Sequence, residues 1–158
     1  LQTVAAELLE AVQALPPAGF ERLVIKVLEA MGYGGSLDAP GAGLGRPGDG
    51  GIDGTIRQDK LGLDMIYIQA KRWRDPVGSP EVMRFCGGLT AHHAHKGVLI
   101  TTSSFTKDAR DYAGRIPQRI ILIDGPQLAN LMIEHGVGVT TKAAYLLKRL
   151  DLDFFDNL

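Results

Sequence analysis

Two short apolar runs in the second half of the chain constrain its fold more than any other feature. Residues 98–100 (VLI) and 120–123 (IILI) contain no polar side chain, as expected of strands that are covered on both faces of a sheet. Residues 106–115 between them carry a helical pattern, and a strand–helix–strand unit makes its two strands parallel neighbours in one sheet. The second half therefore predicts an α/β fold.

The first half adds helices and a hairpin to this sheet. Apolar residues at helical spacing predict a short helix over residues 3–15 and a longer one over residues 17–31. Residues 52–58 and 65–72 have the pattern of two strands joined by a turn. The glycine-rich residues 33–51 that precede them predict an irregular loop.

The remaining elements complete one central mixed β-sheet flanked by helices. The pattern predicts strands at 97–102 and 119–124, helices at 80–95 (with Val82, Met83, Phe85, Cys86 and Leu89 inward) and 125–135, a weaker helix at 142–150, and an acidic tail at 151–158.

Composition narrows the class of protein. The 158 residues fit one domain, and the formal net charge of -1 gives no overall basic field. The only cysteine is Cys86, which favours a reducing cytoplasm. No apolar run reaches the ~18 residues that span a bilayer, and no signal peptide is visible. The chain does not begin with methionine, which suggests a fragment of a longer protein.

A site is expected where polar side chains interrupt the apolar hairpin. Asp53 follows a glycine turn, and Gln69 and Lys71 break the strand at residues 65–72. Alternation puts Gln69 and Lys71 on one face of that strand, two residues apart at ~3.3 Å per residue. If the two strands pair, Asp53 lies at the same end. Glu21 lies on a neighbouring helix beside its apolar stripe.

These residue types suit phosphodiester hydrolysis at a divalent metal. Mg²⁺ (or Mn²⁺) takes hard oxygen ligands, so we expect Asp53 as the main charged ligand, with the Gln69 amide oxygen and the Ala70 backbone carbonyl beside it. Glu21 would complete the shell directly or through water. Lys71 would hold an attacking water and stabilise negative charge that develops at phosphorus.

Simpler interpretations of the same residues stay open. Asp53 beside Gly54 is also a common turn residue. Gln69 and Lys71 are equally compatible with the solvent face of an edge strand, and Glu21 with an exposed helix face.

Basic and hydroxyl side chains near this site are candidates for DNA contact. Arg72, Trp73 and Arg74 follow Lys71 directly and suit phosphate contact and stacking on a base. Lys107 lies on the predicted helix at residues 106–115, and Ser103 belongs to the hydroxyl-rich run at residues 101–104 that precedes it. Simpler roles stay open here too: Trp73 fits a cap on the core, Arg72, Arg74 and Lys107 fit the solvated surface, and Ser103 fits a strand end and helix cap.

The chain resembles the Mrr-type restriction endonuclease catalytic domain, a branch of the PD-(D/E)xK nuclease superfamily. The resemblance rests on four segments in the family's order: residues 20–34 (FERLVIKVLEAMGYG), 48–54 (GDGGIDG), 67–73 (YIQAKRW) and 97–106 (GVLITTSSFT). It implies a restriction-endonuclease-like fold with the catalytic domain at residues 17–140. Residues 1–16 would then be an N-terminal helix, which is compatible with the remnant of a linker, and residues 141–158 a C-terminal helix and acidic tail.

The resemblance also implies function. Asp53, Lys71, Gln69 and Glu21 map onto the family's active site, with Gln69 in place of the more common acid, and Asp49 falls in a matched segment without a clear role. A Mg²⁺-dependent nuclease for modified, typically methylated, double-stranded DNA is expected. The family usually carries an N-terminal winged-helix recognition domain, which this chain begins too late to contain, and often cuts as a homodimer. A non-catalytic DNA-binding module and a nuclease for branched DNA remain alternatives.

Overall fold

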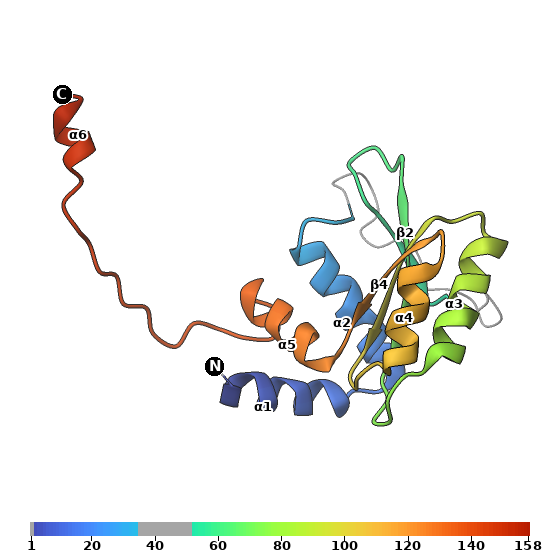
Figure 1. The fold of residues 1–158 in the computed structure, drawn as a ribbon. Coiled ribbons are helices and arrows are strands. Elements are labelled where there is room, and N and C mark those ends of the chain that lie inside the picture. The colour runs from blue at the N-terminus through green and yellow to red at the C-terminus, as the bar shows by residue number, and fades with distance from the viewer. Residues whose placement is uncertain (1, 35–51) are drawn as a thin grey trace.

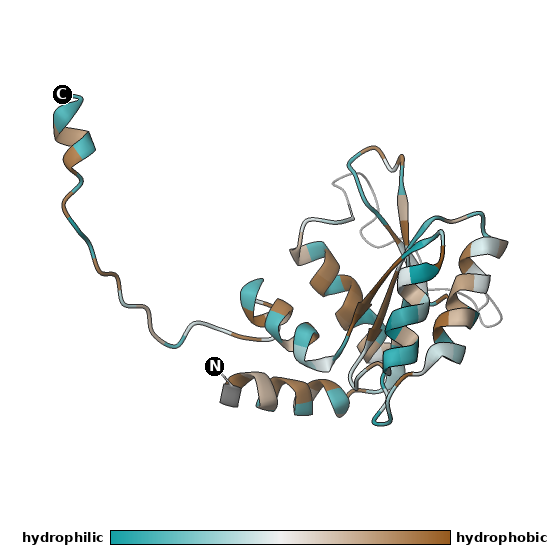
Figure 2. Cartoon of the chain, in the orientation of Figure 1, coloured by the Kyte–Doolittle hydropathy of each residue, from teal (hydrophilic) through white to brown (hydrophobic). Residues whose placement is uncertain are grey.

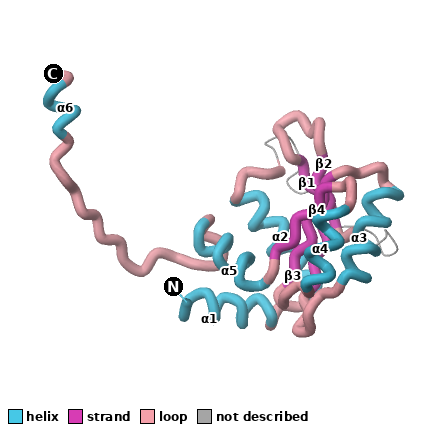
Figure 3. Tube along the Cα trace, in the orientation of Figure 1, coloured by secondary structure: helices cyan, strands magenta, loops and turns pink. Residues whose placement is uncertain are grey.

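A mixed four-stranded sheet forms the centre of the protein. The structure, a computed structural model, describes residues 2–34 and 52–158. The strands β1 (Gly54–Arg57), β2 (Met65–Lys71), β3 (Lys96–Thr101) and β4 (Arg119–Ile123) lie in the order β1-β2-β3-β4. β1 is antiparallel to β2, whereas β2, β3 and β4 are parallel. The mixed sheet expected from the sequence is confirmed, and Figures 1 and 3 show helices on both of its faces.

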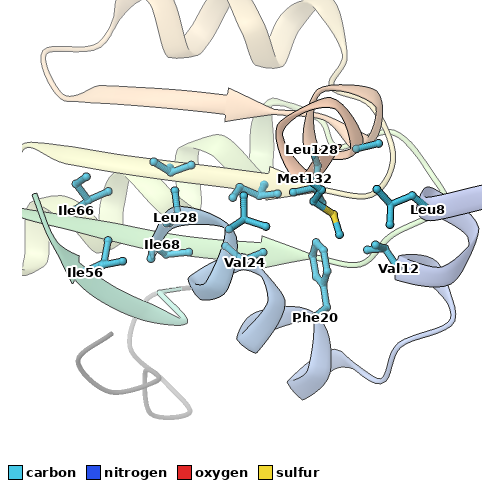
Figure 4. Packing of buried hydrophobic residues seen from close by; sticks show 14 residues of the cluster. Leu8, Val12, Phe20, Val24, Leu28, Ile56, Ile66, Ile68, Leu128 and Met132 are labelled. Atoms are coloured by element: carbon cyan, nitrogen blue, oxygen red, sulfur yellow. The ribbon is translucent and has the colours of Figure 1, made fainter. Parts of the chain in front are cut away.

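One face of the sheet is covered by α1 (Gln2–Gln13), α2 (Pro17–Ala30) and α5 (Gly125–Glu134). In Figure 4, Phe20, Val24 and Leu28 of α2 point at Ile68 and its neighbours in the sheet, while Leu8 and Val12 of α1 approach from the side. The helix at residues 1–16 therefore contributes to the core of the domain. This packed layer supports the carboxyl end of β2, where the sequence predicts the site.

The opposite face is covered by α3 (Ser79–Ala91) and α4 (Lys107–Arg115). Val82, Phe85 and Leu89 of α3 pack against Leu99 of β3. The helix α4 begins where expected, because the Thr106 hydroxyl accepts a hydrogen bond from the backbone of Ala109 at 3.1 Å. This layer fixes the start of α3 beside the carboxyl end of β2.

Several boundaries differ from the sequence predictions. The first strand is shorter than residues 52–58, so Asp53 lies just before β1. Met83 was expected to face inward, but 47% of it is exposed. The helix α3 ends at Ala91, followed by His93 with a positive φ of 55°. Most of the predicted loop at 33–51, with Asp49, lies outside the described residues.

The C-terminal helix was placed wrongly. Residues 142–150 are not helical, and the helix α6 (Leu152–Asp156) lies in the segment predicted as an acidic tail. Asp151 caps α6, because its side chain accepts a hydrogen bond from the backbone of Phe154 at 3.2 Å. Residues 142–150 lack such a cap and a surface to pack on, and short isolated helices are marginal in water. Within the described part of the chain, no helix has the length and apolarity needed to cross a membrane.

Candidate active site

Asp53 is held at the junction of β1 and β2 by two hydrogen bonds. Its backbone N–H donates to the carbonyl of Ile68 at 2.7 Å, which continues the β1–β2 pairing by one residue. Its carboxylate oxygen Oδ2 accepts from the backbone N–H of Ala70 at 2.6 Å. A charge-assisted bond of this length is among the stronger ones in proteins, so the carboxylate has a fixed position near the carboxyl end of β2.

Glu21 faces the same position from α2. A narrow pocket is lined by both acids together with Ile25, Ile68 and Ala70. Burial raises the pKa of Asp53, and the Ala70 N–H and the charge of Lys71 offset this in part. Burial also raises the pKa of Glu21. The negative charge of Asp53 raises it further, and the positive charge of Arg22 lowers it in part. Two half-buried carboxylates in one pocket, of which one raises the pKa of the other, are typical of a cation site.

Lys71 lies at the end of β2 with an acidic partner of its own. Its Nζ is 3.1 Å from Glu81 Oε2, and only 15% of each of these two side chains is exposed. The same ammonium lies 5.0 Å from the centroid of the Trp73 ring. Glu81 also pairs with Arg84 at 3.1 Å. The lysine is thus tethered by α3 while its charge still acts on Asp53.

Glu81 was not predicted as part of the site. The only available signal was local: an acid next to Pro80, in the first turn of a predicted helix, where it complements the helix dipole. Its contact with Lys71 depends on how α3 docks on the sheet, which the spacing of residues does not reveal.

Gln69 is buried within β2. It is 7% exposed, and its amide oxygen Oε1 has no hydrogen-bond partner among the described residues. Because β2 lies between β1 and β3, the interpretation as a solvent-facing residue of an edge strand is wrong for Gln69. A buried acceptor without a partner costs free energy, and such groups recur at functional sites.

The two faces of β2 divide the expected site residues. Ala70 belongs to the face that packs on α2 and carries the pocket of Glu21 and Asp53. Gln69 and Lys71 alternate onto the other face, where Lys71 meets α3. The structure therefore brings Asp53, Glu21 and Ala70 into one pocket, with Lys71 within electrostatic range, and places the Gln69 side chain on the opposite face.

Three of the expected DNA contacts lie just beyond β2, and all three are exposed. The guanidinium of Arg72 donates to the carbonyl of Gln13 at 3.0 Å, which ties the end of α1 to the end of β2. Trp73 is 36% exposed, and its backbone carbonyl accepts from the Thr102 hydroxyl at 2.7 Å. Arg74 makes no side-chain contact within the described ranges that would restrain it.

The other two expected contacts lie around the start of α4. Lys107 is exposed in the first turn of this helix. The Ser103 hydroxyl donates to the carbonyl of Asp75 at 2.7 Å, so it already holds the loop between β2 and α3. These two residues border the same end of the sheet as Lys71.

The donor atoms fit Mg²⁺ or Mn²⁺ in their chemistry. The carboxylates of Asp53 and Glu21 share one pocket, whereas the unpartnered amide oxygen of Gln69 lies on the other face of β2. Carboxylates are hard oxygen ligands of the kind that these ions take alongside several waters. Residues 2–34 and 52–158 contain no cluster of three or more His, Cys, Asp or Glu residues suited to a metal, so such a site would depend on two carboxylates.

The raised pKa values predict how metal and pH change stability. Both folded-state pKa values lie above their ordinary values of 3.8 and 4.5, so the folded state binds more protons than the unfolded state and stability falls as pH rises through that window. A cation bound between the two acids favours their ionised forms and offsets this cost. At tenfold its Kd, Mg²⁺ adds ~1.4 kcal/mol, or roughly 3–6 °C in Tm.

The expected rise in Tm is measured by thermal melting with and without Mn²⁺ or Mg²⁺. We expect it at pH 7.5 and not at pH 4, where protonated carboxylates do not bind metal. Glu21→Gln should remove most of the gain, whereas Glu10→Gln on the exposed side of α1 should keep it. An equal gain in both variants would contradict the assignment.

Comparison with known proteins agrees with the fold. A family model for the Mrr catalytic domain, described as a restriction endonuclease, matches residues 12–132. The structure of the DNA modification-dependent restriction endonuclease AspBHI aligns with a TM-score of 0.64 and 19% identity, covering 85% of this chain and 36% of that chain. A structure of the MspJI restriction endonuclease with a 27-mer oligonucleotide aligns with a TM-score of 0.49 and 25% identity over 82% of this chain and 27% of that one.

A curated relative extends the match to almost the whole chain. The type IV methyl-directed restriction enzyme EcoKMrr of Escherichia coli (strain K12) is 48% identical over 155 residues, which are 97% of this chain and 49% of the relative. The chain therefore spans about half the length of that relative. With a family model over most of its length and a relative at this identity, the chain belongs to the Mrr-type restriction endonuclease catalytic domain family.

Proposed function

We propose that the chain is a divalent-metal-dependent DNA endonuclease domain that hydrolyses phosphodiester bonds at the end of β2. The observation that carries this proposal is the carboxylate of Asp53, fixed on the Ala70 N–H, in one pocket with Glu21 and within the field of Lys71. Two acids and a lysine at one end of a sheet, in a member of a restriction endonuclease family, support phosphoryl chemistry more than any other.

Each residue has a separate task in this proposal. Asp53 and Glu21 would hold Mg²⁺ or Mn²⁺, with the Ala70 carbonyl as a further donor, whereas the amide oxygen of Gln69 lies on the other face of β2 and would not reach the same ion. The metal, when bound, neutralises the scissile phosphate and lowers the pKa of a bound water. Before DNA binds, the ion pair with Glu81 keeps the Lys71 ammonium near the site. During the reaction Lys71 moves from Glu81, orients the attacking water and stabilises the charge that develops on the phosphate oxygens.

We further propose modified DNA as the substrate, because the curated relative is named as methyl-directed. Arg72, Trp73, Arg74, Lys107 and Ser103 border the site and would contact the DNA backbone and an adjacent base. Cleavage of both strands by a homodimer, a separate winged-helix domain that recognises the modification, and a cytoplasmic location belong to the same proposal.

Plasmid cleavage tests the proposed function. With Mg²⁺ or Mn²⁺ the protein should nick or cut plasmid DNA, and EDTA should abolish the activity. Lys71→Met should lower the rate by roughly 10²–10³-fold, the effect typical of a lost charge-stabilising group. Lys60→Met, in the exposed β1–β2 turn, is the matched control and should cut at the wild-type rate. A Lys71→Met protein of full activity would refute the mechanism. Equal rates on methylated and unmethylated plasmid, measured on the protein together with its recognition domain, would refute the substrate.

One observation favours a non-catalytic DNA-binding module instead. Lys71 is paired with Glu81, and an amide stands where the wider superfamily has an acid. A salt-sensitive gel shift without metal-dependent nicking would support that alternative. Four-way junctions in the same assay would detect a preference for branched DNA.

A further inference from the structure

The C-terminal segment exposes apolar side chains to an unusual degree. All residues from 140 to 158, here called the tail, are exposed, and Figures 1 and 2 show the tail extending away from the domain with apolar residues along it. Tyr145 is 94% exposed, Leu147 101%, and Phe154 and Phe155 57% each. Contiguous apolar exposure of this extent marks an interaction site.

The tail ends in a short helix that carries two exposed aromatic rings. The helix α6 has only five residues and packs on nothing except itself, where the rings of Phe154 and Phe155 meet edge to face at 5.2 Å. A helix this short is not stable in water without a partner surface. Three acids, Asp151, Asp153 and Asp156, accompany the two rings.

The domain has an apolar groove of matching size at the edge strand β4. The groove, here called the β4 groove, has a volume of about 220 Å³, and an apolar cavity of roughly 150 Å³ is enough to hold a benzene ring. Ile121, in the edge strand β4, is 47% exposed there. The apolar lining comes from the end of α2, the starts of β2 and β3, and the length of β4: Leu28, Met31, Ile66, Val98, Ile121 and Ile123.

The charges of the two surfaces are complementary. Lys96 and Arg119 lie at the β4 groove, opposite in sign to the three acids around α6, whereas the basic residues of the tail, Lys142, Lys148 and Arg149, lie between α6 and the domain. Lys96 already contacts Asp64 Oδ2 at 2.8 Å and Gln58 Oε1 at 2.7 Å. Arg119 is exposed and makes no ion pair with any described residue. Such pairs add little affinity, but they select the partner and its orientation.

A second copy of the chain is the occupant that these features favour. Val137 and Val139 pack against the core beside α1 and α5, and from there the tail leaves its own domain. At ~3.3 Å per residue the tail is long enough to return to its own domain, yet no tail residue becomes buried on it. We propose that the tail of one copy docks α6, with an aromatic ring, into the β4 groove of a second copy, and that the exchange is reciprocal about a two-fold axis. The proposal concerns assembly and does not depend on catalysis.

Cysteine crosslinking tests this exchange. In a Cys86→Ala background, one protein carries Asn157→Cys in the tail and another carries Gln58→Cys at the groove. Mild oxidation of the mixture should give a disulfide-linked heterodimer. Glu10→Cys, on the exposed side of α1, replaces Gln58→Cys as the matched control and should not crosslink. A disulfide that forms only within a single chain carrying both cysteines would overturn the proposal, as would no crosslink.

Charge reversal tests the same contact in solution. Light scattering should show a dimer for the wild type, and Arg119→Glu should weaken the dimer at least tenfold. Asp153→Lys in the other copy should restore it, a rescue that a merely misfolded variant would not give. Both side chains are exposed, and circular dichroism confirms the fold of each variant. A monomeric wild type, or no rescue, would contradict the exchange.

Discussion

Asp53→Asn is expected to abolish metal-dependent cleavage while the chain remains folded. The asparagine carbonyl still accepts the Ala70 N–H, which Asp53 Oδ2 now accepts at 2.6 Å, so the junction of β1 and β2 is kept. Only the charge is lost, and with it the main attraction for the cation. We expect a loss of roughly 10³-fold or more in rate, because metal neutralisation of the phosphate supplies several kcal/mol to the transition state.

Asp53→Ala separates the structural role of this residue from its charge. Alanine leaves the Ala70 N–H without its acceptor, which costs about 1–3 kcal/mol when the group is buried. Urea unfolding should therefore rank alanine below asparagine and wild type, whereas plasmid cleavage should be equally absent in both variants. If the asparagine variant cleaves DNA at more than a tenth of the wild-type rate, the carboxylate does not hold the metal.

The asparagine variant should also unfold at a higher temperature than metal-free wild type at neutral pH. Burial raises the pKa of Asp53, and the charge of Asp53 raises the pKa of Glu21. Both effects show that the ionised pair destabilises the folded state. The same geometry thus links a cost in stability to a capacity for binding cations, as is common at active sites.

Local patterns were enough to predict most of the sheet. The apolar runs at β3 and β4 and the alternation in β2 depend on which side chains a sheet buries, and the mixed sheet confirms these strands. The expectation that β4 is covered on both faces is wrong, because it is an edge strand in which 47% of Ile121 is exposed. Pairing of the hairpin was enough to expect Asp53 near the end of β2, and its bond to Ala70 agrees with this.

Contacts made by docking of distant elements were not predictable in this way. Glu81 reaches Lys71 because α3 packs its apolar side on β3, and no spacing in the sequence encodes that distance. The segment at residues 142–150 has helix-forming residues, but nothing in one copy covers it. Its conformation depends on a partner surface, which local propensity does not describe.

The burial of the Gln69 side chain was also not predictable from the sequence. A glutamine in an alternating strand is compatible with solvent, and only the cover of this face of the sheet by α3 and α4 excludes it. The result is an amide oxygen without a partner among the described residues, on the same face of β2 as Lys71. Gln69 breaks the rule that a buried polar atom has a hydrogen-bond partner, and such exceptions often mark functional positions. Replacing the amide tests which role Gln69 has.

Gln69→Met is expected to stabilise the protein and to reduce cleavage. Methionine is similar in length, is flexible, and carries no polar oxygen that must be desolvated. Because Gln69 Oε1 has no hydrogen-bond partner among the described residues, its removal should raise the free energy of unfolding by about 1–2 kcal/mol, or roughly 2–8 °C in Tm. Cleavage should fall because a polar group on the same face of β2 as Lys71 is lost.

Gln118→Met is the matched control, because the amide of Gln118 is satisfied. Its Nε2 donates to the Thr90 hydroxyl at 2.9 Å and its Oε1 accepts from the Cys86 thiol at 3.5 Å. Removing it should destabilise the protein by about 1 kcal/mol and leave cleavage unchanged. Urea unfolding and plasmid cleavage measure both effects. If Gln69→Met also destabilises the protein, its amide oxygen is satisfied in solution, and Gln69 is retained for structure and not for catalysis.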